Sequence, residues 1–283
     1  MPRERAHRLF SQLSVDLAKI TADYPAQVLC PLCLTPFTKE AIDLEEPDLT
    51  EEHIIPEKLG GTLVTLTCKR CNNTYGSKVE AHLVQMLRSH DSLKGTSNRP
   101  LRGRMEIGGM TVPADIEWKA AETTTIRLRP FKPAVHEAIK KHLRDGTDEI
   151  NLNLNFRYIP LRSYVAVFRI AYLAMFRELS YGYILSRAAG AVREIIARFE
   201  NAPEQLGDIV GEAKNMSPAP TEPLQFYAVR GGIAVMVVIT LLADTKRHYV
   251  TFMPSPELAP EMVLETLLAA AQTVGKGRPA KDQ

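Results

Sequence analysis

The sequence has few cysteines, no long apolar run and no marked excess of either charge. A membrane-spanning helix needs about 18 or more uninterrupted apolar residues, and no such segment is present. The most apolar stretch, residues 231–243, is better explained as buried strands. The N-terminus lacks an apolar segment followed by a small-residue cleavage site, so we expect no secretory signal and a cytoplasmic protein.

The charge balance excludes a strongly basic or acidic protein. The chain has 35 Lys and Arg against 33 Asp and Glu, a formal net charge of +2, and residues 1–100 carry 12 basic against 13 acidic side chains. Bulk electrostatics therefore do not require a polyanionic partner, and any argument for nucleic acid must come from local chemistry.

The four cysteines form two Cys-x-x-Cys pairs, Cys30 with Cys33 and Cys68 with Cys71. Two such knuckles can meet around zinc, because each turn directs two sulfur atoms to one point. In a reducing compartment we expect metal ligands rather than disulfides, with four ordinary buried thiols as the alternative. A zinc ion with four thiolate ligands has no open position for water, so catalysis would require a second centre.

Hydrophobic periodicity and turn residues predict a mixture of helices and strands, an α+β chain. In the N-terminal third we expect an amphipathic helix, a β-hairpin turned by Gly60-Gly61 and a second helix. Their ranges are 7–22 for the first helix, 54–55 and 63–67 for the two strands, and 72–90 for the second helix. Residues 40–57 carry eight carboxylates, which is typical of a solvated loop.

Beyond a linker around residues 91–102 we expect a larger mixed domain. Its predicted elements are two or three strands over 105–129, a helix over 133–143, a strand over 150–159, a long helix over 162–199, strands at 225–230, 232–243 and 248–253, and a helix over 257–273. The aromatic stripe of the long helix is interpreted as core. Its six arginines are interpreted as a polar face: Arg162, Arg169, Arg177, Arg187, Arg193 and Arg198. Gly231-Gly232 predicts a tight turn.

One group of motifs resembles a known family. Glu52-His53-Ile54-Ile55-Pro56, Leu59-Gly60-Gly61, Cys68-x-x-Cys71-Asn72-Asn73 and Gly76-Ser77-Lys78 occur in the order typical of the HNH endonuclease family in its four-cysteine form. The resemblance covers about residues 28–85. It implies a small zinc-stapled ββα-metal (treble-clef-like) nuclease module, in which two strands and a helix hold one divalent cation.

The resemblance also implies roles for individual residues. His53 corresponds to the general base that takes a proton from water. Glu52 and Asn72 correspond to oxygen ligands of a catalytic Mg²⁺ or Mn²⁺. The alternatives are a strand histidine at position 53, Glu51 in place of Glu52 as the ligand, and a simple helix cap at Asn72.

Four further residues are candidates for supporting roles. Asn73 would orient His53 or cap the helix, and Lys69, Arg70 and Lys78 would contact phosphates or be solvated. Two departures from the family pattern concern the loop and the metal ligand. Glutamate stands where aspartate is frequent, and no asparagine precedes the third cysteine, where Thr62 or Thr65 is the candidate substitute.

The expected organisation is an N-terminal helix, the nuclease module, a linker, an α+β domain and a basic tail, at residues 1–27, 28–92, 93–104, 105–274 and 275–283. The predicted function is a metal-dependent endonuclease acting on DNA, with RNA as the alternative substrate. Residues 105–274 would recognise the target, form a homodimer or bind a regulatory partner. The competing hypotheses are a non-catalytic zinc module that binds nucleic acid or protein, and a nuclease inactive until the second domain is engaged. The resemblance suggests bacterial restriction or phage defence as the context.

Overall fold

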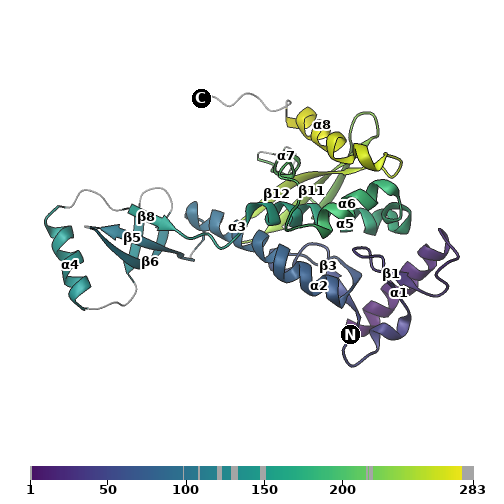
Figure 1. Cartoon of the computed structure of the whole chain (residues 1–283), viewed down its shortest axis with the longest axis horizontal. Coiled ribbons are helices and arrows are strands. Elements are labelled where there is room, and N and C mark those ends of the chain that lie inside the picture. The colour runs from purple at the N-terminus through teal and green to yellow at the C-terminus, as the bar shows by residue number, and fades with distance from the viewer. Residues whose placement is uncertain are drawn as a thin grey trace. The chain divides into compact units, whose positions relative to one another are not determined.

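A computed structural model describes residues 2–97, 99–107, 109–119, 123–128, 133–146, 151–214, 216 and 219–275. Helices and antiparallel sheets alternate along the chain, which confirms the α+β class (Figure 1). Two compact units are present. Unit 1 comprises residues 1–83, 159–242 and 246–283, and unit 2 comprises residues 84–158 and 243–245. These ranges differ from the expected order of domains, because residues 159–242 pack with the N-terminal segment and not with the residues that precede them.

The first part of unit 1 contains one helix and four short strands. They are α1 (Pro2–Ala18), β1 (Val28–Leu29), β2 (Pro36–Phe37), β3 (Leu49–His53) and β4 (Val64–Cys68), with 3₁₀ turns at Lys39–Ile42 and Glu57–Leu59. The helix begins and ends earlier than predicted, and Ile20 follows it with 52% of its surface exposed. Among the described helices, none is both long and apolar enough to cross a membrane.

The hairpin of β3 and β4 starts five residues before the predicted range. Antiparallel pairing runs from Leu49 opposite Cys68 to His53 opposite Val64. The prediction of a strand at Ile54 and Ile55 was wrong: both residues lie in the bend that follows β3, with side chains 0% and 1% exposed. Their burial in the core, rather than strand pairing, explains why this part of the loop is apolar.

Three helical segments follow without interruption. They are α2 (Lys69–Tyr75), a π-helical turn (Gly76–Glu80) and α3 (Ala81–Leu93). The predicted helix over 72–90 is confirmed, but it begins at Lys69 because Cys68 acts as the N-cap, its sulfur atom accepting from the amide of Cys71. A π-helical turn inserts one extra residue per turn and is frequent at functional sites.

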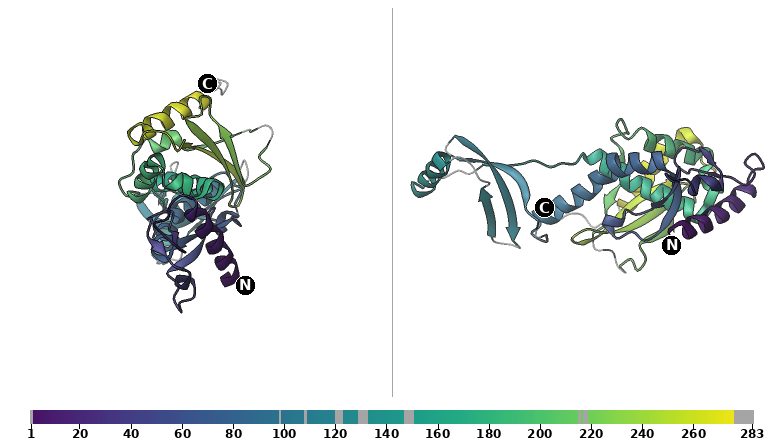
Figure 2. Two further views of the ribbon diagram at one scale, coloured as in Figure 1. Left: turned by 90° about the vertical axis from the view of Figure 1, so that its right-hand side faces the viewer. Right: turned by 90° about the horizontal axis from the view of Figure 1, so that it is seen from below.

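The second part of unit 1 is a four-stranded antiparallel sheet with helices against it. The elements are α5 (Pro160–Ile184), α6 (Arg187–Ala197), α7 (Leu206–Ile209), β9 (Gly211–Glu212), β10 (Leu224–Ala228), β11 (Ala234–Leu242), β12 (Lys246–Pro254), a 3₁₀ turn (Pro260–Met262) and α8 (Val263–Gly275). The strand order is β10-β11-β12-β9. Helices α5, α6 and α8 pack against β12 (Figures 1 and 2).

The predicted helix over 162–199 is interrupted twice, inside α5 by the non-helical backbone of Ser180 (φ 51°, ψ −145°) and again between α5 and α6. The chain breaks after α5, and the hydroxyl of Ser186 accepts from the amide of Ala189 at 3.1 Å to cap α6. The final helix begins at Val263, not near residue 257. The turn at Gly231-Gly232 is confirmed by the positive φ angles of both glycines, 94° and 71°. Of the predicted tail, residues 276–283 lie outside the described residues.

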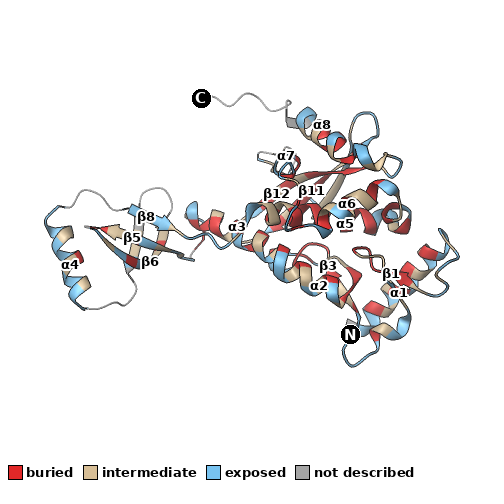
Figure 3. Ribbon diagram, viewed as in Figure 1, coloured by how far each residue is buried: buried red, intermediate tan, exposed pale blue. Residues whose placement is uncertain are grey.

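The aromatic stripe of α5 is core, as predicted. Phe168, Tyr172 and Phe176 are at most 1% exposed, and Figure 3 shows most of α5 as buried. The interpretation of the arginines as a polar face was wrong for Arg169, whose side chain is 0% exposed. A fully buried guanidinium requires partners of opposite charge, and these lie in the N-terminal segment.

Unit 2 starts within α3, at Val84, and continues, among the described residues, as a second antiparallel sheet with one further helix. Its elements are β5 (Leu101–Ile107), β6 (Met110–Lys119), β7 (Thr123–Leu128), α4 (Pro133–Arg144) and β8 (Asn151–Leu154), in the order β7-β6-β5-β8. The predictions of two or three strands over 105–129, a helix over 133–143 and a strand over 150–159 are confirmed in kind, but β5 begins earlier, at Leu101 within the predicted linker, and β8 is shorter than predicted. Ile139 and Val135 on α4 pack against one face of the sheet, which forms the core of this unit (Figure 2).

Candidate zinc centre and active site

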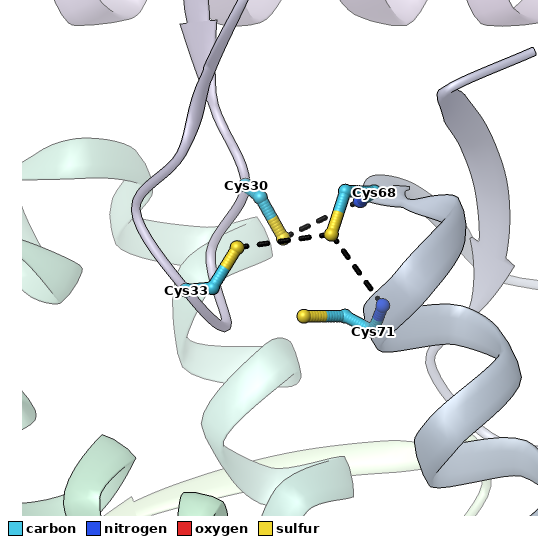
Figure 4. Close-up of side chains that lie close together, drawn as sticks. All are labelled: Cys30, Cys33, Cys68 and Cys71. Carbon is cyan, nitrogen blue, oxygen red and sulfur yellow. Dashed lines mark hydrogen bonds between the residues drawn. The ribbon is translucent and has the colours of Figure 1, made fainter.

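The first cysteine knuckle is a tight turn between β1 and β2. Cys30 follows β1, and its amide donates to the carbonyl of Thr35 at 3.0 Å. The amide of Leu34 donates back to the carbonyl of Cys30 at 2.8 Å. Leu34 has a positive φ of 57°, so the chain reverses sharply and brings Cys33 beside Cys30. The second knuckle is the first turn of α2, which places Cys68 and Cys71 on the same side of the helix start (Figure 4).

The four sulfur atoms converge as a metal site requires. All lie within 4.8 Å of one another, and those of Cys33 and Cys68 are 3.7 Å apart. Tetrahedral zinc with Zn–S bonds of about 2.3 Å places its sulfur atoms about 3.8 Å apart. A disulfide would need about 2.05 Å, so the four cysteines are free thiols suited to one zinc ion. The expected zinc ligand set is therefore brought together.

Hydrogen bonds couple the four thiols, and their pKa values move in opposite directions. The hydrogen bond with Cys30 lowers the pKa of Cys68 to about 7, and the same neighbour lowers the pKa of Cys33. Hydrogen bonds within the cluster raise the pKa values of Cys30 and Cys71. In turn, a hydrogen bond to Cys33 raises the pKa of the Arg70 guanidinium. Arg70, predicted as a phosphate contact, thus lies beside the cysteine cluster.

Helix α5 supports the first knuckle from the other side. The hydroxyl of Tyr172 donates to the carbonyl of Pro31 at 2.8 Å. The hydroxyl of Tyr181 donates to the carbonyl of Leu29 and accepts from its amide, each at 2.9 Å. Burial raises the pKa of Tyr172 to about 12, so this hydroxyl keeps the proton that it donates. The knuckle is therefore held by residues more than a hundred positions away.

Asn72 joins α2 to β3. Its amide nitrogen donates to the carbonyl of Glu51 at 3.0 Å and to the hydroxyl of Thr50 at 3.1 Å. Both acceptors belong to the strand that also carries Glu52 and His53. Within the described part of the chain the amide oxygen accepts no hydrogen bond. The side chain is thus held by its nitrogen, and its oxygen remains available to a cation.

Glu52 lies at the centre of a buried ionic cluster. Its carboxylate pairs with Arg169 of α5, and Arg169 also pairs with Glu80 in the π-helical turn. Glu52 is 4% exposed, and the guanidinium lies over the Tyr75 ring at 5.2 Å. Burial raises the pKa of Glu80, and the nearby charge of Glu52 adds to this effect. Two carboxyl groups thus share one guanidinium.

Glu51, the alternative ligand, has a different partner. Its carboxylate accepts from Nε of Arg5 on α1 at 2.9 Å and is 15% exposed. Side-chain alternation places Glu52 on the same face of β3 as Thr50 and Glu51 on the other face, and His53 is the last residue of the strand, where the bend at Ile54 begins. The hydrogen bond from Asn72 to Thr50 therefore favours Glu52 as the carboxylate on the side of Asn72.

His53 is the last residue of β3 and is half-buried. Its imidazole makes no hydrogen bond within the described residues, so neither ring nitrogen is committed to a protein partner there. The loop after it is tightly held: the amide of Ile54 donates to the carbonyl of Leu63 at 2.9 Å, and that of Gly61 to the carbonyl of Pro56 at 3.2 Å. Backbone contacts brace this loop. Of the two candidate threonines, Thr65 is buried and Thr62 is exposed.

The remaining predicted residues lie outside this group. Lys69 pairs with Glu46 at 2.7 Å, and Lys78 and Asn73 are exposed. The carbonyl of Asn73 accepts from the Ser77 hydroxyl at 2.7 Å, which is a bond within the helix. These contacts assign no catalytic role to the three residues.

Two residues of the site, Arg169 and Glu80, were missed from the sequence. The signal for Arg169 is its position in the run Val165–Phe176, where it is the only charged residue among eleven apolar ones. A charge in such a run is placed in a core and needs a buried partner. The sequence does not identify that partner, because Arg169 and Glu52 are 117 positions apart and meet only in the folded chain.

Residues 30–88 match the family model described as HNH endonuclease. This range contains both cysteine knuckles, Glu52, His53 and Asn72, and the chain therefore carries an HNH endonuclease module. Searches of curated proteins and of solved structures found no match.

Proposed function

We propose that the module at residues 30–88 hydrolyses phosphodiester bonds in DNA with the help of a divalent cation. The observation that carries the proposal is the anchoring of Asn72 to β3, next to Glu52 and His53, by a helix that starts at the zinc-binding cysteines. The family match supports a nuclease and a nucleic-acid substrate. DNA is the substrate that the resemblance implies, and RNA is the alternative. A cytoplasmic location and a place in bacterial restriction or phage defence also belong to the proposal.

The donor atoms suit Mg²⁺ or Mn²⁺. The carboxylate of Glu52 and the amide oxygen of Asn72 are hard oxygen ligands, of the kind that these cations prefer. When bound, the cation supplies charge stabilisation at the phosphate and at the leaving oxygen. His53 takes the proton from the attacking water with an uncommitted ring nitrogen. Arg169 holds Glu52 in one orientation.

One observation favours a second candidate function. Glu52 is almost fully buried and already paired with Arg169, as expected of a structural carboxylate. In a non-catalytic zinc module that binds nucleic acid or protein, Glu52, His53 and Asn72 would only stabilise the fold. The two candidates differ in a single measurable property, which is cleavage.

The test is incubation of supercoiled plasmid DNA, and of a structured RNA, with the purified chain and Mg²⁺ or Mn²⁺. We expect wild type to cut DNA, His53→Ala to lose cutting, and His136→Ala to retain it. His136 lies on α4 of unit 2 with about half of its side chain exposed, so it controls for the loss of an imidazole. Equal cutting by wild type and His53→Ala would contradict the proposal, and absence of cutting by all three would favour the non-catalytic module.

A further inference from the structure

The sheet of unit 2 has one covered and one open face. On β5 the side chains of Met105 and Ile107 point into the core beneath α4, with 3% and 1% of their surfaces exposed. Arg102 and Arg104 alternate with them and are exposed on the opposite face. On β8, Asn153 is likewise exposed, and Leu152 and Leu154 pack against the core.

This open face contains a basic hollow of about 600 Å³. Its polar lining consists of three arginines and two asparagines, Arg102, Arg104, Arg157, Asn153 and Asn155. None of the described residues that line it is acidic. All five of these side chains are exposed, and none of the three arginines forms an ion pair with the described residues. Three guanidinium groups around one hollow, none of them in an ion pair with the described residues, attract an anion from solution.

The acidic residues of the same sheet do not neutralise the hollow. Glu106 accepts a hydrogen bond from the amide of Asn153 at 3.2 Å, and Glu117 lies 3.7 Å from Arg127 on β7. Asp115 stands opposite Arg102 in the register of β5 and β6. With both Glu106 and Asp115 counted against the three arginines, the hollow keeps one excess positive charge.

The geometry suits a chain of phosphates better than a single small anion. Arg102 and Arg104 are two residues apart on one strand, which separates their Cα atoms by about 6.8 Å. Arg157 approaches from the segment after β8. The planar, multi-donor guanidinium is the side chain best matched to phosphate, and asparagine amides are common partners of the nucleic-acid backbone. A hollow open to solvent also admits a long polymer.

We propose that this arginine hollow, defined by Arg102, Arg104 and Arg157 with Asn153 and Asn155, binds phosphate groups of the nucleic-acid backbone. The choice of nucleic acid among polyanions rests on the proposed nuclease function. The contact lies outside the matched segment, so unit 2 supplies affinity for the substrate and the zinc-stapled module supplies the reaction. Contacts of this kind position a nucleic acid without reading its sequence.

The test is binding of a fluorescently labelled DNA duplex to the full-length chain, measured by anisotropy without added divalent cation so that the DNA stays intact. One variant, called the hollow variant, combines Arg102→Gln, Arg104→Gln and Arg157→Gln. A matched variant combines Lys140→Gln, Lys141→Gln and Arg144→Gln on α4, which removes the same charge from the helix on the covered side of the sheet. All six side chains are exposed, so both variants are expected to fold, and circular dichroism checks this.

We expect the hollow variant to bind about tenfold more weakly or worse, and the slope of log K against log salt to fall by about 2 to 3. The matched variant should keep both the affinity and the slope of wild type. Equal weakening in the two variants, an unchanged affinity of the hollow variant, or no binding by wild type would each overturn the inference. Labelled single-stranded DNA and RNA in parallel show which form of nucleic acid the hollow prefers.

This outcome is separable from that of the nuclease assay. His53→Ala should bind the duplex like wild type whether or not the chain cuts DNA. If cleavage fails while binding remains sensitive to the hollow, the proposed function fails and the inference stands. If cleavage depends on His53 but the hollow variant binds DNA as tightly as wild type, the inference fails while the proposed function stands.

Discussion

The guanidinium of Arg169 on α5 donates to the carboxylate of Glu52 on β3, and both side chains are almost completely shielded from solvent, at 0% and 4% exposure. Glu80 shares the same guanidinium. Buried charges lose their hydration, so each member depends on the others. This contact orients the Glu52 carboxylate and ties residues 159–242 to the N-terminal module.

Arg169→Met should destabilise the chain strongly. It leaves Glu52 and Glu80 buried without a cation, and removal of one partner from a buried ionic group costs about 3 to 5 kcal/mol. Urea denaturation of wild type and variant measures the difference. Arg198→Met removes a comparable pair with Glu194 that is exposed, and it should cost only a small fraction of that amount.

The triple variant Arg169→Met, Glu52→Gln and Glu80→Gln should recover most of the lost stability, because no unpaired charge remains. If Arg169→Met and Arg198→Met lose the same free energy of unfolding, the buried cluster has no special role in stability.

Glu80 makes the stability of the fold depend on pH, and its raised pKa sets the direction of that dependence. Burial raises its pKa above the ordinary 4.5, so the folded state binds a proton more tightly than the unfolded state does. The stability from protonated Glu80 is fully present below the unfolded pKa and is lost as pH rises through the folded pKa. Wild type should therefore gain stability relative to Glu80→Gln as pH falls from 7 towards 4.5. Urea denaturation measures the free energies of unfolding of both proteins. If their difference stays constant between pH 7 and 4.5, the raised pKa of Glu80 is contradicted.

The zinc module was the most predictable part of the molecule, because its signals are local. Each Cys-x-x-Cys pair shapes its own turn, and the order of Glu52-His53, Gly60-Gly61 and Asn72 indicates a hairpin followed by a helix. The start of β3 was misplaced, because Ile54 and Ile55 have strand propensity but are buried in a bend. Propensity reports which residues suit a strand, whereas pairing with β4 decides where the strand lies.

The rest depends on contacts between distant segments. Composition around residues 91–102 indicates a boundary, but it cannot show that residues 159–242 return to the N-terminal segment. The partners of Arg169, and the hydrogen bonds from Tyr172 and Tyr181 to the first knuckle, arise only once α5 packs there. The break between α5 and α6 has a local signal in Ser186, a good N-cap residue inside a continuous helical pattern.

Zinc should be stoichiometric and necessary for the module. Purified wild type is expected to contain one zinc per chain by elemental analysis, and Cys68→Ser should lose it together with the thermal stability of the module. Thr35→Ala is the matched control, because it removes a hydroxyl 3.1 Å from the Cys33 sulfur without removing a ligand. Retention of zinc and of an unchanged melting curve in Cys68→Ser would contradict the assignment.

Gly61 is required by the loop that follows His53. A Cβ atom at this position would collide with the carbonyl oxygen of Ile55, so Gly61→Ala should displace that loop and cost about 1 to 3 kcal/mol or more. Gly76→Ala meets nothing within 4 Å and has helical dihedral angles, so it should stabilise the chain by about 0.4 to 1 kcal/mol. Thermal melts of the two variants measure these effects, and a neutral Gly61→Ala would show that the loop is not tightly held.

The most direct test of the central claim, a cation between Glu52 and Asn72 beside His53, is anomalous diffraction from crystals of the chain soaked in Mn²⁺. The account predicts two metal positions. One is zinc at Cys30, Cys33, Cys68 and Cys71, and the other is manganese about 2 Å from a carboxylate oxygen of Glu52 and the amide oxygen of Asn72. Zinc alone, with the Glu52 carboxylate still fully engaged by Arg169 and no manganese at Asn72, would contradict it.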